Sequence, residues 1–222
     1  ALPIWGVYDL IDLADGECVL EQALLQSSRF PSLHLLPAAQ FARAKDLDPK
    51  DFRKVLRSLE ASYDFVLIDC PAGIERGLRN VLNAGVNEVF LVVTADDICM
   101  RSAERAAQLI GEKQLGRPRL IVNRLDEQLI RFGEMLPAQT VAETLDLPLL
   151  GEVPEDSSVY RSLLRHRLPV EYDSEARNAF LRIASRLRGS SLPFPRYGSG
   201  KPSLLKRLKR KDLKEVIPID DY

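Results

Sequence analysis

The 222-residue sequence predicts an α/β fold built around a mostly parallel sheet. Short β-prone runs alternate with longer helical patterns along the chain, as in successive βα units. The run Phe65–Ile68 is apolar without alternation, which is typical of a strand buried on both faces of a parallel sheet. It leads into Asp69 and a Cys-Pro-Ala-Gly turn, and the carboxyl end of such a strand is where open α/β sheets bind ligands.

Each expected element follows from a local pattern. Strands are expected, in chain order, at 33–36, 65–69, 88–94, 119–123 and 149–153. Helices are expected at 19–26, 49–61, 75–83, 102–115, 138–145, 157–165 and 175–188. Asp48-Pro49 is a favourable helix start, because proline suits the first turn and Asp51 lies near the positive end of the helix dipole. Pro118 and Pro148 each follow a helical pattern and mark where that helix must end.

Composition places the chain among ordinary globular proteins, with 45% hydrophobic and 28% charged residues. A net charge of −1 gives no overall attraction to nucleic acid or membrane. The cysteines Cys18, Cys70 and Cys99 have no paired spacing, which argues against a disulfide framework or a zinc site and favours a reducing cytosol. No apolar run reaches the length of a membrane span, and no signal peptide precedes the first strand.

The predicted organisation is one domain over residues 1–189, a linker rich in Ser, Pro and Gly over 190–202, and a basic tail over 203–222. Residues 201–222 are net +3, and the rest of the chain is net −4. On a helical wheel the tail separates an apolar arc from a basic one, the pattern of an interfacial membrane helix. The residues of the two arcs are Leu204, Leu205 and Leu208, and Lys206, Arg207, Lys209 and Arg210. A solvated basic tail is the alternative, and the acidic Asp220-Asp221 departs from the membrane pattern.

Motifs spread over most of the chain carry a family resemblance. In chain order they are Tyr8-Asp9-Leu10, Leu20–Leu24, Leu35–Gln40, Tyr63–Glu75, Glu88–Thr94, Met100–Arg105, Ile121–Arg124 and Gly151–Asp156. Together they resemble the MinD family of septum-placing ATPases, of the deviant-Walker-A class that also contains ParA-type partition ATPases, over roughly residues 7–189. The resemblance implies a P-loop NTPase-like three-layer sandwich.

One part of the family pattern is missing from residues 1–222. The deviant P-loop, Gly-Lys-Gly-Gly-Val-Gly-Lys-Thr, does not occur ahead of Tyr8, so the chain is expected to be N-terminally truncated by about one βαβ unit. That unit would supply the backbone N–H groups and lysines that hold the phosphates. Because phosphoryl transfer depends almost entirely on positioning and charge stabilisation, this chain alone is predicted to be deficient in hydrolysis.

The resemblance assigns a nucleotide and Mg²⁺ site. Asp69 matches the carboxylate on the Mg²⁺ side, acting through water, with a strand-ending N-cap as the alternative. Pro71, Ala72 and Gly73 match switch II near the γ-phosphate, with a simple turn as the alternative. Two further sets are expected to border the adenine, namely Asn123 and Arg124, and Pro154, Glu155 and Asp156. Their alternative is helix capping, for which Asp156 is well suited, and both roles are compatible.

The resemblance also implies partners. Asp96, Asp97, Arg101 and Glu104 fall in the family's dimer and partner region, although a solvated helix face is the alternative. The complete protein would bind ATP and Mg²⁺, form a homodimer when ATP-bound, and meet MinC-like and MinE-like proteins. It would lie in the cytoplasm, peripherally on the inner face of the cell membrane, with no nucleic acid bound. A ParA-like partition or flagellum-placing ATPase, a non-catalytic interaction module and a fragment without function remain the alternatives.

Overall fold

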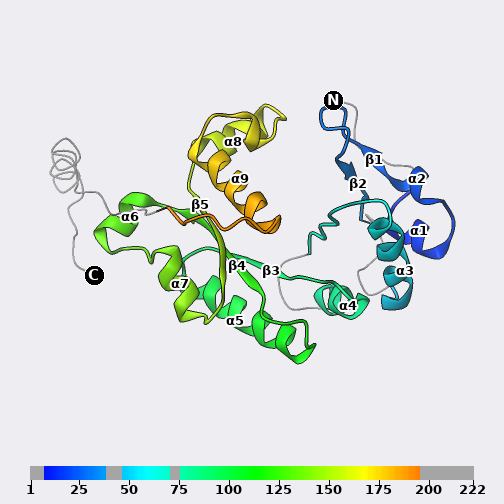
Figure 1. Cartoon of the computed structure of the whole chain (residues 1–222), viewed down its shortest axis with the longest axis horizontal. Helices are drawn as coiled ribbons and strands as arrows, with labels where there is room; N and C mark the ends of the chain where they lie inside the picture. Colours follow the sequence, from blue (N-terminus) through cyan, green and yellow to red (C-terminus); the bar gives the residue numbers. More distant parts are fainter. Residues whose placement is uncertain (1–7, 39–46, 71–75, 196–222) are drawn as a thin grey trace, which may run out of the picture. The chain divides into compact units, whose positions relative to one another are not determined.

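The computed structural model describes residues 8–38, 47–70 and 76–195 (Figure 1). They form two compact units. The first comprises the chain up to Leu91 together with Ile98–Arg119, and the second comprises Val92–Asp97 and the chain from Leu120 onward.

The first unit is mainly helical. Its elements are α1 (Leu10–Asp15), α2 (Leu20–Ala23), β1 (Leu25–Gln26), β2 (His34–Leu35), α3 (Pro49–Glu60), α4 (Arg76–Ala84) and, from its second residue, α5 (Asp97–Glu112). Asp48 caps α3 by accepting the Lys50 N–H at 2.7 Å, and Pro49 opens the helix as the sequence predicts. Helices α3 and α4 pack together around Phe52, Leu56 and Ala84. Val66 and Ile68, shortly before Asp69 in the sequence, pack against this cluster.

The second unit contains the parallel part of the sheet. Its elements are β4 (Arg119–Leu125, from Leu120), α6 (Glu127–Phe132), α7 (Ala138–Thr144), β5 (Leu149–Pro154), α8 (Ser157–Leu164), the 3-10 helix η1 (Pro169–Glu171) and α9 (Glu175–Leu187). With β3 (Phe90–Val93), the strands form a sheet in the order β3-β4-β5, and β4 and β5 are parallel. Helix α9 lies along β5 and buries Ala176, Ala179 and Ile183 against it (Figure 1).

The predicted α/β class and parallel pairing are confirmed, with one strand wrong. The segment 65–69 is not a strand, because no strand among the described residues pairs with its backbone. Its residues alternate: Val66 and Ile68 pack against the cluster of α3 and α4, whereas Phe65 and Leu67 are exposed. The apolar run therefore has one covered face instead of the two that the sequence pattern predicts.

The N-terminal elements also differ from expectation. The expected helix at 19–26 ends at Ala23, and Leu25–Gln26 forms β1 instead. This strand pairs with β2 in an antiparallel sheet of two strands, so the expected strand at 33–36 does not join the parallel sheet among the described residues. Two short helices were not expected, α1 and α6. Each begins at an aspartate cap, Asp9 or Asp126, and ends at a left-handed glycine, Gly16 or Gly133.

Candidate functional site

The carboxyl ends of β4 and β5 bring two of the predicted residue sets together. Because the strands are parallel, both end at the same edge of the sheet, with Leu125 opposite Pro154. The Glu155 N–H donates to the Leu125 carbonyl at 2.9 Å, so the ladder continues past the end of β5. This β4/β5 edge, Asn123–Arg124 with Pro154–Asp156, is the candidate site.

A bulge in β4 shapes this edge. Val122 pairs with Glu152 and Leu125 with Pro154, so β4 has one residue more than β5 between the two pairs. Arg124 takes up the difference with a left-handed backbone, φ 56°. A non-glycine residue rarely adopts this conformation, which costs roughly 1 kcal/mol and occurs preferentially at functional sites. The Asn123 side-chain oxygen accepts the Arg124 N–H at 2.9 Å and supports the bulge.

An ion pair joins the two strand ends. Arg124 Nε donates to Glu155 Oε2 at 2.8 Å, and both side chains are largely exposed. The hydrogen bond to Glu155, followed by its charge, raises the pKa of the Arg124 guanidinium. An exposed pair contributes little to stability, so its main effect is to fix the orientation of two polar side chains at the edge.

Asp156 connects the edge to two helices. Its Oδ1 accepts the Ser158 N–H at 2.8 Å, which caps α8, and its Oδ2 accepts the Ala176 N–H at 3.2 Å at the start of α9. Burial alone would raise the pKa of this carboxyl, but the hydrogen bonds from Ser158 and Ala176 and the charge of Arg161 lower it overall. The capping role predicted for Asp156 is confirmed, and a nucleotide-binding role stays a prediction.

Asp69 belongs to the other unit and follows the one-sided apolar segment. Its side chain is exposed, and Pro71, Ala72 and Gly73, predicted to form switch II, lie outside the described residues. Burial raises the pKa of the neighbouring Cys70 thiol, and the Asp69 carboxylate adds to the effect. A thiol with a raised pKa carries less thiolate, so Cys70 is a poor nucleophile here.

The residues of the predicted partner region lie at and after the start of α5. Asp96 accepts a hydrogen bond from the Thr94 hydroxyl, and Asp97 is the first residue of the helix. Arg101 and Glu104 lie on its exposed face, opposite the buried Met100, Ala103 and Ala106. This exposure fits a partner surface and a solvated face equally, so the assignment stays a prediction.

Two further predictions concern the membrane segment and the Mg²⁺ ion. The predicted membrane residues 204–210 lie outside the described residues. Within residues 8–38, 47–70 and 76–195, no group of three or more His, Cys, Asp or Glu side chains is placed to hold a metal ion. A Mg²⁺ ion held through one carboxylate, water and phosphate oxygens does not need such a group.

The sequence reasoning missed a buried carboxyl beside the candidate site. Glu152 lies in β5 at 6% exposure, and its Oε1 has no hydrogen-bond partner among the described residues. Burial raises the pKa of Glu152 to about 7, although the charges of Arg182 and Arg186 lower it. Arg186 also donates to the Leu150 carbonyl at 3.0 Å, so α9 is tied to β5 next to this carboxyl. A charged residue inside an otherwise apolar strand pattern was the available signal.

Comparison with known proteins identifies the family. No family model matches the chain. The septum site-determining protein MinD of Synechocystis is 35% identical over 208 residues, covering 92% of this chain and 77% of its own length. MinD of Bacillus subtilis is 34% identical over 191 residues, covering 84% and 70%.

Solved structures agree with these sequence matches. The MinD cell division protein of Aquifex aeolicus superposes with a TM-score of 0.79 at 28% identity, covering 88% of this chain and 80% of that one. The MinC:MinD complex of the same organism gives 0.76 at 29% identity, covering 86% and 77%. MinD of Pyrococcus horikoshii, complexed with Mg-ADP, gives 0.68 at 27% identity, covering 81% and 73%. The chain belongs to the MinD family of septum site-determining proteins, within the MinD/ParA P-loop ATPases.

Proposed function

We propose that this chain is the greater part of a nucleotide-dependent dimeric switch that positions the bacterial division septum by inhibiting division away from mid-cell. Membership of a family of cell-division ATPases supports the proposal. The observation that carries it is the β4/β5 edge, where a bulge, an ion pair and a helix cap hold polar groups of two parallel strands together.

The β4/β5 edge suits an adenine base. The Asn123 oxygen already accepts one hydrogen bond from the Arg124 N–H, so its amide N–H groups remain able to donate to a ring nitrogen, and a second lone pair remains to accept. Pro154 and Glu155 would border the base, and the Arg124–Glu155 pair would hold that border in place. These residues would bind and orient the nucleotide without contributing to chemistry.

Asp69 would hold Mg²⁺ through water, and Pro71, Ala72 and Gly73 would contact the terminal phosphate. An exposed carboxylate after an apolar segment fits a hydrated Mg²⁺, which keeps several of its waters in protein sites. The ion, when bound, would neutralise charge on the phosphates. The relative from Pyrococcus horikoshii was solved with Mg-ADP, which supports this choice of ligand.

Hydrolysis would require groups that residues 1–222 do not contain. The sequence has no glycine-rich loop ending in Gly-Lys-Ser or Gly-Lys-Thr, and the phosphate lysines and Mg²⁺-binding hydroxyl belong to such a loop. The chain as given would therefore bind nucleotide weakly and release phosphate at the background rate. The same chain preceded by a Gly-Lys-Gly-Gly-Val-Gly-Lys-Thr unit would hydrolyse ATP.

The partners would be a second copy, a MinC-like effector, a MinE-like regulator and an anionic membrane. The complex of Aquifex MinD with MinC supports the effector, and Asp96, Asp97, Arg101 and Glu104 would form its docking region. None of the helices in the described residues is long and apolar enough to cross a bilayer. Membrane association would therefore use the basic segment with Leu204, Leu205 and Leu208, doubled by dimerisation.

Titration with a fluorescent adenine nucleotide tests the nucleotide site. Asn123→Ala is expected to weaken binding about tenfold, the loss typical of a hydrogen-bonded base contact. Asn87→Ala is the matched control, because Asn87 is an exposed asparagine outside the candidate site, and it is expected to change nothing. Equal nucleotide affinities for the Asn123→Ala and Asn87→Ala variants would show that the adenine base does not bind at the β4/β5 edge.

Co-sedimentation separates the septum role from a ParA-like role. Preceded by the Gly-Lys-Gly-Gly-Val-Gly-Lys-Thr unit, and with ATP present so that it dimerises, the chain is expected to pellet with vesicles rich in phosphatidylglycerol and not with DNA. Leu205→Ser with Leu208→Ser should abolish pelleting, whereas Leu213→Ser, opposite Leu204 on the helical wheel, should not. Retention on DNA without vesicle binding would favour the partition alternative instead.

A further inference from the structure

Helix α8 turns its large apolar side chains outward. Tyr160, Leu163 and Leu164 have the spacing i, i+3, i+4, so they share one face, and each is between 64% and 66% exposed. We call these three residues the α8 stripe. Surface helices of globular proteins normally bury such a face.

The opposite face of α8 explains this orientation. Ser158 and Ser162 point inward, and Ser162 is fully buried with its hydroxyl donating to the Val159 carbonyl at 2.6 Å. Small side chains let the helix lie close to the rest of the unit, while the Asp156 cap fixes where it begins. The outward stripe is therefore built into the fold, and a contiguous apolar patch of this kind marks an interaction site.

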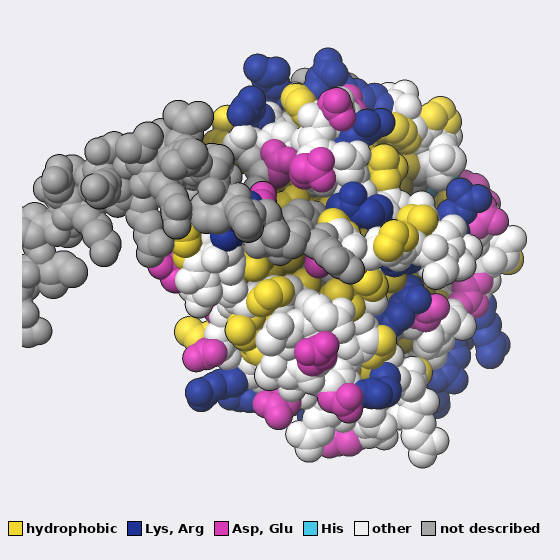
Figure 2. Space-filling model, turned by 60° about the vertical axis from the view of Figure 1, so that its left-hand side comes forward, with side chains coloured by type: hydrophobic (Ala, Val, Ile, Leu, Met, Phe, Trp, Pro, Cys, Tyr) yellow, Lys and Arg dark blue, Asp and Glu magenta, His cyan; other side chains and the backbone are white. Residues whose placement is uncertain are grey.

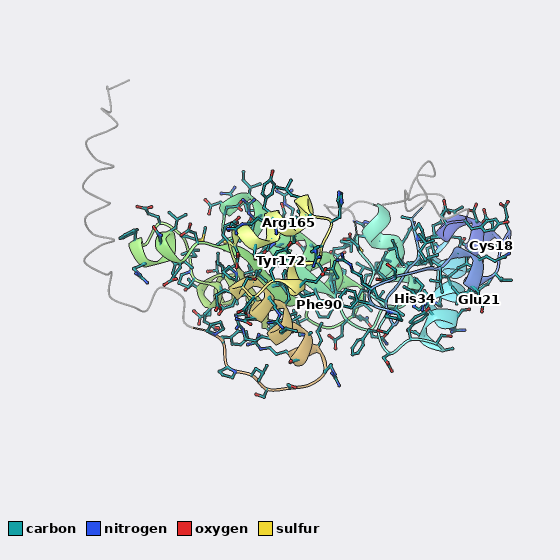
Figure 3. All side chains as sticks on the ribbon, turned by 90° about the horizontal axis from the view of Figure 1, so that it is seen from above. Cys18, Glu21, His34, Phe90, Arg165 and Tyr172 are labelled. Atoms are coloured by element: carbon teal, nitrogen blue, oxygen red, sulfur yellow. The ribbon has the colours of Figure 1, made fainter. Side chains whose placement is uncertain are left out.

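The α8 stripe lies in a purely basic segment. Residues 157–168 contain Arg161, Arg165 and Arg167 and no acidic residue, a net charge of +3. Arg161 is exposed, and its Nη2 donates a hydrogen bond to the Ser157 hydroxyl at 2.8 Å. Arg165 is the exposed C-cap residue of the helix (Figure 3). A partner for this surface should combine apolar side chains with negative charge.

Residues 215–222 have that composition. The sequence Glu-Val-Ile-Pro-Ile-Asp-Asp-Tyr contains three acids and no basic residue, a net charge of −3, around three aliphatic side chains. We propose that residues 215–222 of the same chain dock on the α8 stripe, with Val216, Ile217 and Ile219 against its apolar side chains and the acids beside Arg161 and Arg165. The proposal is independent of the nucleotide and membrane roles.

The connecting chain is long enough for this contact. Nineteen residues separate Pro195, where the described structure ends, from Glu215. If residues 203–214 form the predicted helix, the connection still spans about 45 Å, from 1.5 Å per helical and 3.4 Å per extended residue. A unit of about a hundred residues is roughly 35 Å across, so any point on it is within reach. Tethering gives an effective concentration in the millimolar range, which lets a short contact form.

An anionic membrane fits the α8 stripe less well. Two acidic residues follow α8: Glu171 ends η1, which contacts α8, and Asp173 has a side chain that is 98% exposed. These carboxylates would repel an anionic leaflet brought against the stripe. An eight-residue peptide covers a smaller area than a leaflet does. It can contact the α8 stripe, Arg161 and Arg165 without lying against the carboxylates of Glu171 and Asp173.

Hydrogen exchange of the 222-residue chain tests the contact. The amides of residues 157–168 are expected to exchange about tenfold faster in Asp220→Asn with Asp221→Asn, as for a helix that loses a covering segment. Asp212→Lys is the matched control, because it changes the charge of the tail by the same two units outside the docking segment, and it should leave exchange unchanged. Arg161→Glu with Arg165→Glu should also speed exchange, and adding Asp220→Arg with Asp221→Arg should restore the slow rate.

Three results would overturn the proposal. Equal exchange in the Asn variant and the Asp212→Lys control would show that residues 215–222 do not cover α8. If the amides of α8 exchange more slowly as the protein concentration rises, the α8 stripe is covered by a second copy of the chain and not by its own tail. Vesicle binding that is lost in Tyr160→Ser with Leu164→Ser, with exchange unaffected by the acidic residues, would assign it to the membrane.

Discussion

Strand β5 and the segment 65–70 are both largely apolar runs, but they are covered to different extents. In β5, Leu150 and Val153 are buried, and the strand pairs in parallel with β4. In the segment 65–70, Phe65 and Leu67 are 59% and 78% exposed, and no described strand lies beside it. Backbone groups need hydrogen-bonding partners, so an apolar run becomes a strand only where a neighbouring strand supplies them.

The difference extends to the polar residues that each run positions. The β4/β5 edge is fixed by a ladder bond, an ion pair and a cap shared by two helices. Asp69 follows a segment held on one face only. Surface exposure is also common elsewhere, and apolar side chains reach the surface between charged ones on the face drawn in Figure 2. We therefore expect the β4/β5 edge to be rigid and, within its own unit, the segment that leads to Asp69 to open more readily.

The largest predicted effect concerns the packing of helix α9 on strand β5. Gly151→Val would place its Cβ on the Ile183 Cγ1 of α9 and is expected to lower the free energy of unfolding by about 3 kcal/mol, as an overpacked core does. Gly111→Ala, at a helix position with open space, is the control and should raise it by up to about 1 kcal/mol. Both are measured by urea unfolding.

A double variant shows whether the overlap with Ile183 is the cause. Combining Gly151→Val with Ile183→Ala should cost clearly less than the sum of the two single changes, because the smaller side chain makes room. Additive costs would mean that β5 tolerates a side chain at position 151 and that α9 is less tightly packed than the structure indicates.

The second prediction concerns the pH dependence of the same strand. Because burial raises the pKa of Glu152 from 4.5 to about 7, the folded state binds the proton more tightly than the unfolded state. The stability from this group is complete below pH 4.5 and is lost as the pH rises through about 7. Relative to Glu152→Gln, the free energy of unfolding should fall by about 2 kcal/mol between pH 5.5 and 8.

Denaturant unfolding across this pH range measures the effect. Glu155→Gln is the control, since the Glu155 side chain is exposed, and its curve should run parallel to that of the unchanged chain. Parallel curves for Glu152→Gln as well would show that water or an arginine keeps Glu152 charged in the folded state.

Local patterns in the sequence predicted much of this architecture. Asp48-Pro49 and Asp156 each mark a helix start, because a cap depends on residues next to it in the chain. The β4 and β5 runs and the family motifs at Asn123–Arg124 and Pro154–Asp156 were also recognised from adjacent residues. The same signals, an aspartate and a following glycine, mark α1 and α6, but six residues are too few for periodicity to show.

Features that depend on distant segments could not be predicted. The left-handed Arg124 follows from the register between β4 and β5, which no single segment specifies. The burial of Glu152 and the tight fit at Gly151 both depend on α9, about thirty residues further on. The failure at 65–69 has the same cause, because strand formation depends on a neighbour that sequence periodicity does not reveal.

The third prediction tests the one-sided packing of the segment 65–70. Ile68→Ala is expected to lower the free energy of unfolding by between about 1 and 2 kcal/mol, because Ile68 packs against the cluster of Phe52, Leu56 and Ala84. Leu67→Ala, one position earlier and 78% exposed, should stay within about 0.5 kcal/mol of the unchanged chain. Thermal and urea unfolding measure both variants. Equal losses of stability in Ile68→Ala and Leu67→Ala would mean that both faces of the segment are covered and that it behaves as a buried strand.

The smallest predicted effect compares one helix cap from each unit. Asp156→Ala removes the acceptor of the Ser158 N–H and leaves the buried Ala176 N–H unpaired, whereas Asp48→Ala removes only the acceptor of the Lys50 N–H. We expect Asp156→Ala to cost about 1 kcal/mol more than Asp48→Ala, the difference being one orphaned buried donor. Asp156→Asn keeps an acceptor oxygen for Ser158 and should recover part of the loss in urea unfolding. Equal costs for the two alanine variants would show that α9 does not rely on Asp156, and the β4/β5 edge would then be held only by its ladder and ion pair.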